Sequence, residues 1–219
     1  MLKIYGVYRS RATRNIWLAL ELGIPFEHVP IMQAYRLADP DAADAPVHTR
    51  SPAFLKVNPN GHIPSIDDDG FVLHESLAIN LYLARKHGGP LAPANVQEEG
   101  LTAMWSLWAA TEVETHALNV LYHMAAKPEA ERDAKLARDS VEALKAQFAV
   151  LDKALAAGNG HLIGNRFTVA DINVAEVMRY AMPARALFEA NPNVQRWLAT
   201  CQARPHFKTM MARREQEPA

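Results

Sequence analysis

The pattern of apolar and polar positions in the first 31 residues predicts a strand, a helix and a second strand. Residues 2–8 are rich in β-forming side chains, and residues 26–31 alternate apolar with polar positions. Between them, residues 12–22 carry apolar side chains at helical spacing. Gly23 stands where a left-handed residue ends a helix, and Pro25 prevents its continuation. The pattern therefore predicts a β-α-β unit with two parallel strands.

The next segment predicts a long loop, a hairpin and a helix. Residues 32–52 show no sustained period, which indicates a loop with one helical turn. Two short apolar runs, 63–66 and 71–74, are separated by a turn that ends in Asp-Gly, and this pattern is typical of a hairpin. Residues 75–87 return to helical spacing. The predicted order is β-α-β, loop, β-β-α.

Beyond residue 87 the strand signals stop. Long helices are predicted over about 97–125, 129–157 and 168–179, with shorter helices in 193–213. Gly88-Gly89-Pro90 has the composition of a linker. The prediction is thus an α/β domain over 1–87, a linker over 88–96 and an all-α helical bundle domain over 97–219.

Composition narrows the classes of function. Of the 219 residues 49% are hydrophobic and 21% charged, as in a soluble globular protein with sizeable cores. A formal net charge of −1 argues against a nucleic-acid partner, and no apolar run is long enough for a membrane span. Cys201 is the single cysteine and is expected to be a buried hydrophobe, and the scattered histidines suggest no metal site. Without a secretion signal, a cytoplasmic location is expected.

Three local motifs can carry chemistry, although each also has an ordinary structural interpretation. Ile63-Pro64 stands at the entry to a predicted strand. A cis bond there would expose the Ile63 backbone for pairing with an extended peptide. The alternative is an ordinary turn before an edge strand. Glu75 and Ser76 stand at a helix start, where an amino group and a carboxylate can bind, or where Ser76 is only an N-cap. Ser10 precedes the first helix and can donate to a thiolate, or can cap that helix.

Taken together, these motifs resemble the glutathione transferase superfamily over essentially the whole chain, and most of all its bacterial serine-type, theta-like members. The resemblance rests on Asn-Pro-x-Gly-x-Ile-Pro at 58–64, on Glu75-Ser76, on residues 81–88 and on the helix-starting box at 167–172. In that box Thr168 and Asp171 are expected to cap each other's backbone amides, which is a folding device. The family fold implied is a thioredoxin-like N-terminal domain followed by a helical domain.

The resemblance also implies roles for individual residues. Ser10 would hydrogen-bond the sulfur of glutathione, Ile63 beside cis-Pro64 would pair with its cysteinyl unit, and Glu75 with Ser76 would hold its γ-glutamyl end. Three residues are candidates for the glycyl end, namely His48, Lys56 and His62. The second-substrate pocket is expected between the loop after the first strand and the long helix of the second domain, and its candidates are Arg9, Arg11, Tyr35, Arg36, Trp105, Trp108 and Glu112.

The expected reaction is conjugation of the glutathione thiolate to a small, hydrophobic electrophile by a homodimer, with glutathione as co-substrate and no metal. Several alternatives stay open. The sequence lacks a cysteine near the first helix and the Ser-Ser-Cys signature of the maleylacetoacetate isomerases. A glutathione-dependent isomerase or dehalogenase would use the same thiol site, and a non-catalytic binding or regulatory protein would keep the fold and have lost turnover. Tyr5 and Tyr8 lie close enough in sequence to replace Ser10 as the thiol partner.

Overall fold

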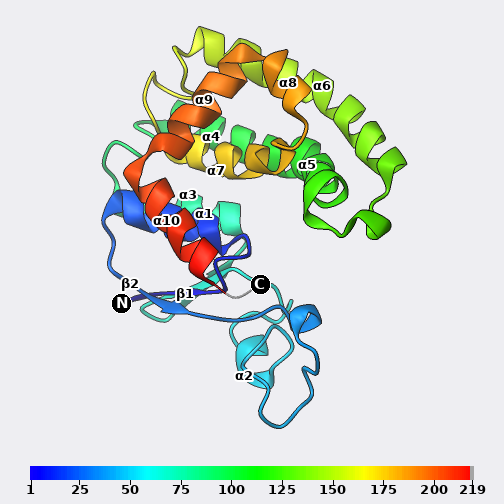
Figure 1. Cartoon of the computed structure of the whole chain (residues 1–219). Coiled ribbons are helices and arrows are strands. Elements are labelled where there is room, and N and C mark those ends of the chain that lie inside the picture. Colours follow the sequence, from blue (N-terminus) through cyan, green and yellow to red (C-terminus); the bar gives the residue numbers. More distant parts are fainter. Residues whose placement is uncertain (218–219) are drawn as a thin grey trace. The chain divides into compact units, whose positions relative to one another are not determined.

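The computed structural model describes residues 1–217, and the chain divides into two compact units (Figure 1). The first unit comprises Met1–His87 together with the C-terminal segment from Pro205 onward. The second unit comprises Gly88–Arg204.

A four-stranded sheet organises the first unit, with strands β1 (Leu2–Tyr5), β2 (Phe26–Val29), β3 (Ser65–Asp68) and β4 (Phe71–His74). The spatial order is β2-β1-β3-β4; β1 pairs in parallel with β2, and the other two pairs are antiparallel. Ile4 lies opposite His28 on one side and Ile66 on the other, and both isoleucines are fully buried. The predicted thioredoxin-like arrangement is confirmed.

Helices α1 (Ala12–Leu22) and α3 (Ser76–His87) pack together in this unit. Helix α1 ends as predicted, because Gly23 adopts a left-handed φ of 65° and its amide returns to the last turn. Between β2 and β3 the chain forms a 3₁₀ turn, Ala34–Arg36, and a short helix, α2 (Pro52–Leu55). The long predicted loop is fastened across its base, because the Thr49 amide donates to the Met32 carbonyl at 2.9 Å.

The second unit is entirely helical, as predicted. Its α-helices are α4 (Val96–Trp108), α5 (Glu114–Leu121), α6 (Ala134–Ala157), α7 (Val169–Met178), α8 (Arg185–Glu189) and α9 (Pro192–Ala203). Two π-helical segments, Ala109–Val113 and Tyr122–Ala126, directly follow α4 and α5. The helix predicted over 97–125 is therefore continuous and contains two π-helical segments. Short 3₁₀ turns occupy Glu129–Glu131 and Arg179–Ala181.

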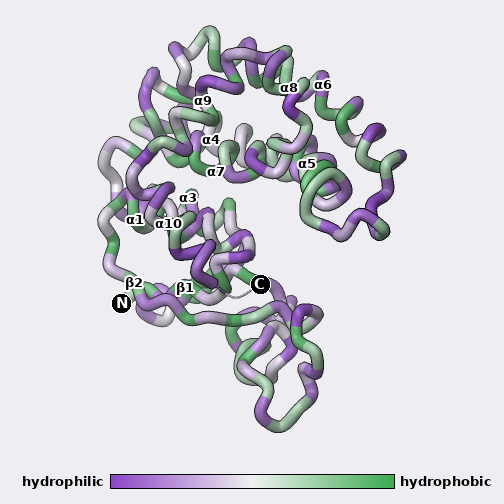
Figure 2. The backbone as a smooth tube through the Cα atoms, viewed as in Figure 1, coloured by the Kyte–Doolittle hydropathy of each residue, from purple (hydrophilic) through white to green (hydrophobic). Residues whose placement is uncertain are grey.

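Helix α7 forms the centre of this unit, and every one of its ten residues is buried. The predicted capping box starts it, because Thr168 and Asp171 bind each other's backbone amides. Helix α6, in contrast, alternates hydrophobic and hydrophilic residues along its length (Figure 2), as expected for a helix with one buried face. Cys201 of α9 is buried, as expected for a small hydrophobe.

The last helix, α10 (Pro205–Gln216), corrects the predicted domain division. The sequence pattern assigned residues 97–219 to one helical domain, whereas α10 packs against α1 of the first unit. The ring of Phe207 meets the fully buried ring of Trp17 edge to face, with centroids 4.9 Å apart. The imidazole of His206 also lies 3.4 Å from the carboxylate of Glu21. Aromatic packing onto α1 therefore extends the first unit to the C-terminal segment.

Candidate active site

Ser10 lies in a tight loop between β1 and α1. Gly6 opens this loop with a φ of 137°, and a Cβ added there would stand only 3.0 Å from Ala12 and 3.3 Å from Ile63. The Ser10 hydroxyl donates to the Val7 carbonyl at 2.6 Å and accepts from the Ala12 amide at 3.1 Å. Ser10 thus satisfies one of the first amides of α1, and its proton is directed at the loop's own carbonyl.

The loop before β3 contains the predicted cis bond between Ile63 and Pro64. Asn58 holds this loop, because its side-chain amide donates to the His62 carbonyl at 2.8 Å and its side-chain oxygen accepts from the Asn60 amide at 3.0 Å. Gly61 has a φ of 62°, which favours glycine. Pro64 is buried and Ile63 half-buried, so the motif at 58–64 delivers a short stretch of strand-like backbone beside Gly6.

Glu75 and Ser76 form the junction between β4 and α3. Glu75 adopts a left-handed φ of 73°, which is uncommon for a residue with a side chain and marks local backbone strain. Its side chain is exposed, whereas Ser76, the first residue of α3, is buried. Strain of this kind persists where the surroundings fix it and is concentrated at functional sites, so the junction is a strong candidate for ligand binding.

A buried polar network supports this junction from behind. The Arg14 guanidinium, 1% exposed, donates to the Ser76 hydroxyl at 3.0 Å. Asn15 donates to the Ser76 carbonyl at 2.8 Å and to Asn80 at 2.7 Å, and Asn80 in turn donates to the Arg14 carbonyl at 3.2 Å. Because the guanidinium only donates, the Ser76 oxygen accepts and its own proton is left for another acceptor.

Sequence reasoning did not find Arg14, Asn15 or Asn80. The available signal was a run of three polar residues, 13–15, inside a helix that is buried over 12–19. A polar run usually marks the solvent face of a helix, and only the fold shows that this run faces α3.

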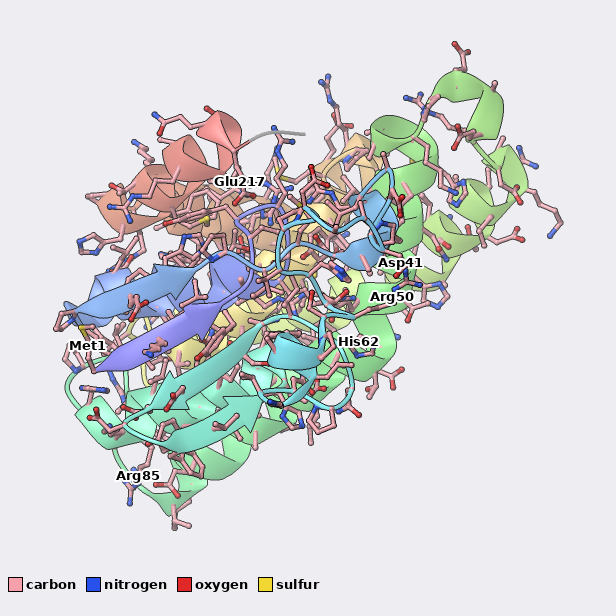
Figure 3. The ribbon with its side chains drawn as sticks, turned by 90° about the horizontal axis from the view of Figure 1, so that it is seen from below. Met1, Asp41, Arg50, His62, Arg85 and Glu217 are labelled. Carbon is pink, nitrogen blue, oxygen red and sulfur yellow. The ribbon has the colours of Figure 1, made fainter. Side chains whose placement is uncertain are left out.

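The candidates for the glycyl end are not equivalent. His48 is buried, and both ring nitrogens serve its own loop: Nε2 donates to the Pro40 carbonyl at 2.9 Å, and Nδ1 accepts from the Arg50 amide at 3.1 Å. Lys56, at the end of α2, and His62 are both exposed. His62 projects from the loop before β3, and Arg50 forms an ion pair with Asp41 in the neighbouring segment (Figure 3). His48 therefore has a structural task, and Lys56 and His62 remain available for a ligand.

The candidates for the second-substrate pocket come from both units. In the first unit, Arg11 and Tyr35 are exposed, while Arg9 and Arg36 are half-buried. In the second unit, Trp105 packs edge to face on Trp108 at 5.1 Å, and the Trp108 indole donates to Gln147 at 3.2 Å. Glu112, in the first π segment, is exposed.

The two tyrosines near Ser10 have different surroundings. The ring of Tyr5 lies 6.3 Å from that of Phe54, and partial burial raises the pKa of its hydroxyl. Tyr8 is buried, its ring packs edge to face on His28 at 4.8 Å, and its hydroxyl accepts from Arg213 of α10 at 3.2 Å. Ser10 is thus the hydroxyl in this loop that stands next to the start of α1.

Two other kinds of site are absent from the part of the chain that the structure describes. Among residues 1–217, no three histidine, cysteine or acidic side chains are placed to hold a metal ion. Within the same residues, no helix combines the length and the apolar character needed to cross a bilayer.

Comparison with known proteins gives the site its context. Residues 4–91 match the family "Glutathione S-transferase, N-terminal domain", and residues 114–205 match "Glutathione S-transferase, C-terminal domain". Glutathione S-transferase 3 of Zea mays is 32% identical, over 96% of this chain and 93% of its own. Glutathione S-transferase GstB of Escherichia coli is 28% identical, over 96% of this chain and 98% of its own.

Among solved structures, glutathione S-transferase I from maize in complex with an atrazine glutathione conjugate superposes with a TM-score of 0.82. It is 26% identical and covers 99% of both chains. The similarity therefore extends through both units, including the loops that carry Ser10, Ile63-Pro64 and Glu75-Ser76. On these grounds, the chain belongs to the glutathione S-transferase family.

Proposed function

We propose that this protein conjugates the thiolate of glutathione to small electrophiles and binds glutathione in its first unit. The observation that carries the proposal is the junction at Glu75 and Ser76, where a strained residue precedes a twelve-residue helix. The positive end of the helix dipole favours a carboxylate there, and the exposed Glu75 carboxylate suits an ammonium group. The γ-glutamyl end of glutathione carries both groups.

The remaining glutathione contacts are proposed from the same loops. The strand-like backbone of Ile63, beside cis-Pro64, pairs with the cysteinyl unit by strand addition. His62 and Lys56 are assigned to the glycyl carboxylate. Ser10 donates to the sulfur, which takes the place of the Val7 carbonyl as acceptor and is thereby stabilised as the thiolate.

Catalysis then consists of holding an ionised sulfur close to the electrophilic carbon. A carbon–sulfur bond forms, the leaving group departs with its bonding electrons, and the thiol proton passes to solvent. The second-substrate candidates are those of the sequence analysis, namely Arg9, Arg11, Tyr35, Arg36, Trp105, Trp108 and Glu112. This makes the protein a serine-type member of the family.

We also propose that the protein is a homodimer. Leu101, Met104 and Leu107 follow one another at helical spacing on α4 and are all exposed. An exposed apolar stripe of this kind is typical of a protein interface. Size-exclusion chromatography with light scattering should give twice the chain mass, and a monomer at micromolar concentration would contradict the proposal.

Calorimetric titration with glutathione tests the binding site. Ser76→Ala removes a hydroxyl that donates to a charged group, so the affinity should fall roughly tenfold or more. Ser140→Ala, a buried serine of α6 in the other unit, is the matched control and should bind like the wild type. Equal affinities of the two variants would reject the assignment of the γ-glutamyl end.

Ser10→Ala separates binding from chemistry. It should bind glutathione, but ultraviolet absorbance of the bound thiolate should appear only at higher pH, because the thiolate loses a hydrogen-bond donor. Conjugation at neutral pH should fall with it. Glutathione binding without conjugation of any electrophile by the wild type would favour a non-catalytic binding protein, and turnover without a conjugate would favour an isomerase.

A further inference from the structure

The carboxylate of Glu217 is bound by the loop that carries Ser10. One of its oxygens accepts from the Tyr8 amide at 2.9 Å, and the other accepts from the Arg9 amide at 2.7 Å. Figure 3 shows Glu217 at the end of α10. Two consecutive backbone amides thus present themselves to the two oxygens of one carboxylate, and neither amide belongs to a helix, since α1 begins at Ala12. Such charge-assisted bonds are shorter and stronger than neutral ones.

Arginine side chains also bind Glu217 and the loop that holds it. The Arg9 side chain donates to the main-chain oxygen of Glu217 at 3.0 Å, and Arg214 donates to the Tyr8 carbonyl at 2.6 Å. Arg213 reaches the Tyr8 hydroxyl. With Arg11, four guanidinium groups stand in residues 8–11 and 213–217, against the carboxylates of Glu215 and Glu217. The excess of positive charge favours an anion at this loop.

The carboxylate lies next to the residue that is proposed to hold the sulfur. Arg9 and Ser10 are consecutive, so their Cα atoms are about 3.8 Å apart. An electrophile must bring its reacting carbon to roughly 3–3.5 Å from the sulfur. The two amides and the Ser10 hydroxyl thus belong to one short loop, and a substituent that extends from the reacting carbon along this loop would meet the Tyr8 and Arg9 amides.

We propose that these two amides form the subsite for a carboxylate on the electrophile, and that Glu217 occupies it as an internal competitor. The inference rests on the proposed function, since it assigns the substrate class of the same thiol site. A carboxylated electrophile replaces Glu217 and keeps both amide bonds, whereas a neutral electrophile has no group to offer them. The enzyme should accordingly select acidic electrophiles, and removal of Glu217 should strengthen that selection.

A matched pair of substrates tests this selection. A chlorodinitrobenzoate and its methyl ester share one reaction: the carbon–sulfur bond forms, chloride leaves with the bonding pair and the thiol proton passes to solvent. In Glu217→Ala the ratio of kcat/KM for the acid to that for the ester should rise about tenfold over the wild type. Glu215→Ala also removes one negative charge from this segment but leaves Glu217 on both amides, so the ratio should rise far less than in Glu217→Ala. An unchanged or lower ratio in Glu217→Ala overturns the proposal.

A binding measurement decides the point independently of turnover. Dinitrobenzoate, which has no leaving group, is titrated into the wild type and Glu217→Ala with glutathione present. Tighter binding to the variant by about tenfold, with no such gain for the methyl ester, supports the anion subsite. Equal binding to both proteins overturns it. A separate titration with glutathione alone reports on the thiol site, so failure of the proposed function is distinguished from failure of the subsite.

Discussion

Replacement of Asp171 by asparagine should be among the most damaging changes of a single atom in this protein. Asp171 is fully buried at the start of α7, and each of its oxygens serves two donors. One oxygen accepts from the amide of Thr168 at 2.9 Å and from its hydroxyl at 3.2 Å. The other accepts from the Trp197 indole at 2.9 Å and from the Leu162 amide at 3.3 Å.

The magnitude follows from counting donors. Asparagine keeps one oxygen and turns its NH₂ group towards the other pair of donors, and each buried donor left without an acceptor costs about 1–3 kcal/mol. Burial raises the pKa of the Asp171 carboxyl, so removing the charge offsets part of this cost. We expect a loss of about 3 kcal/mol in the free energy of unfolding, which lowers the Tm of a chain of this size by roughly 6–12 °C.

Scanning calorimetry at fixed protein concentration measures the effect. The control is Asp133→Asn, since Asp133 caps α6 through the Leu136 amide at 2.9 Å but is exposed. Asparagine is an equally good N-cap there, so the Tm of the control should stay close to that of the wild type. The cost of Asp171→Asn should also shrink in a Trp197→Phe background, where one donor is absent. The reasoning would be refuted if Asp171→Asn lost as little stability as the control, or if its loss were the same in the wild-type and Trp197→Phe backgrounds.

Two further variants probe other contacts. Arg166 hydrogen-bonds Glu98 and lowers the pKa of its carboxyl to about 2. Because a lowered carboxyl pKa stabilises the fold above pH 4 to 5, the wild type should be more stable than Glu98→Gln by about 2 kcal/mol at pH 7. In a calorimetric pH series, this difference should vanish as the pH falls towards 2. Arg14→Lys keeps the charge but loses the planar donor to Ser76, so the affinity for glutathione, measured by titration, should fall about three- to tenfold. An unchanged affinity would show that Ser76 needs no support from α1.

The sequence predicted the local features of this protein well, because each is determined by neighbouring residues. Helix α1 occupies the predicted range, since Gly23 supplies the left-handed residue that ends it. The bond before Pro64 is cis as proposed, and the capping box of Thr168 and Asp171 starts α7. In all three cases the signal lies within a few residues of the feature itself.

The contacts that complete the candidate site join residues far apart in sequence. Arg14 contacts Ser76 from 62 positions away, and Glu217 contacts the Tyr8 amide from 209 positions away. No periodic pattern can report such a pairing, since a period describes one element and not its partner. The sequence shows that α10 is a helix, but its place on α1 is decided by the edge-to-face packing of Phe207 on Trp17. The same helix ends at Glu217, which contacts the loop that carries Ser10, so the proposed anion subsite depends on aromatic packing at the opposite end of α10.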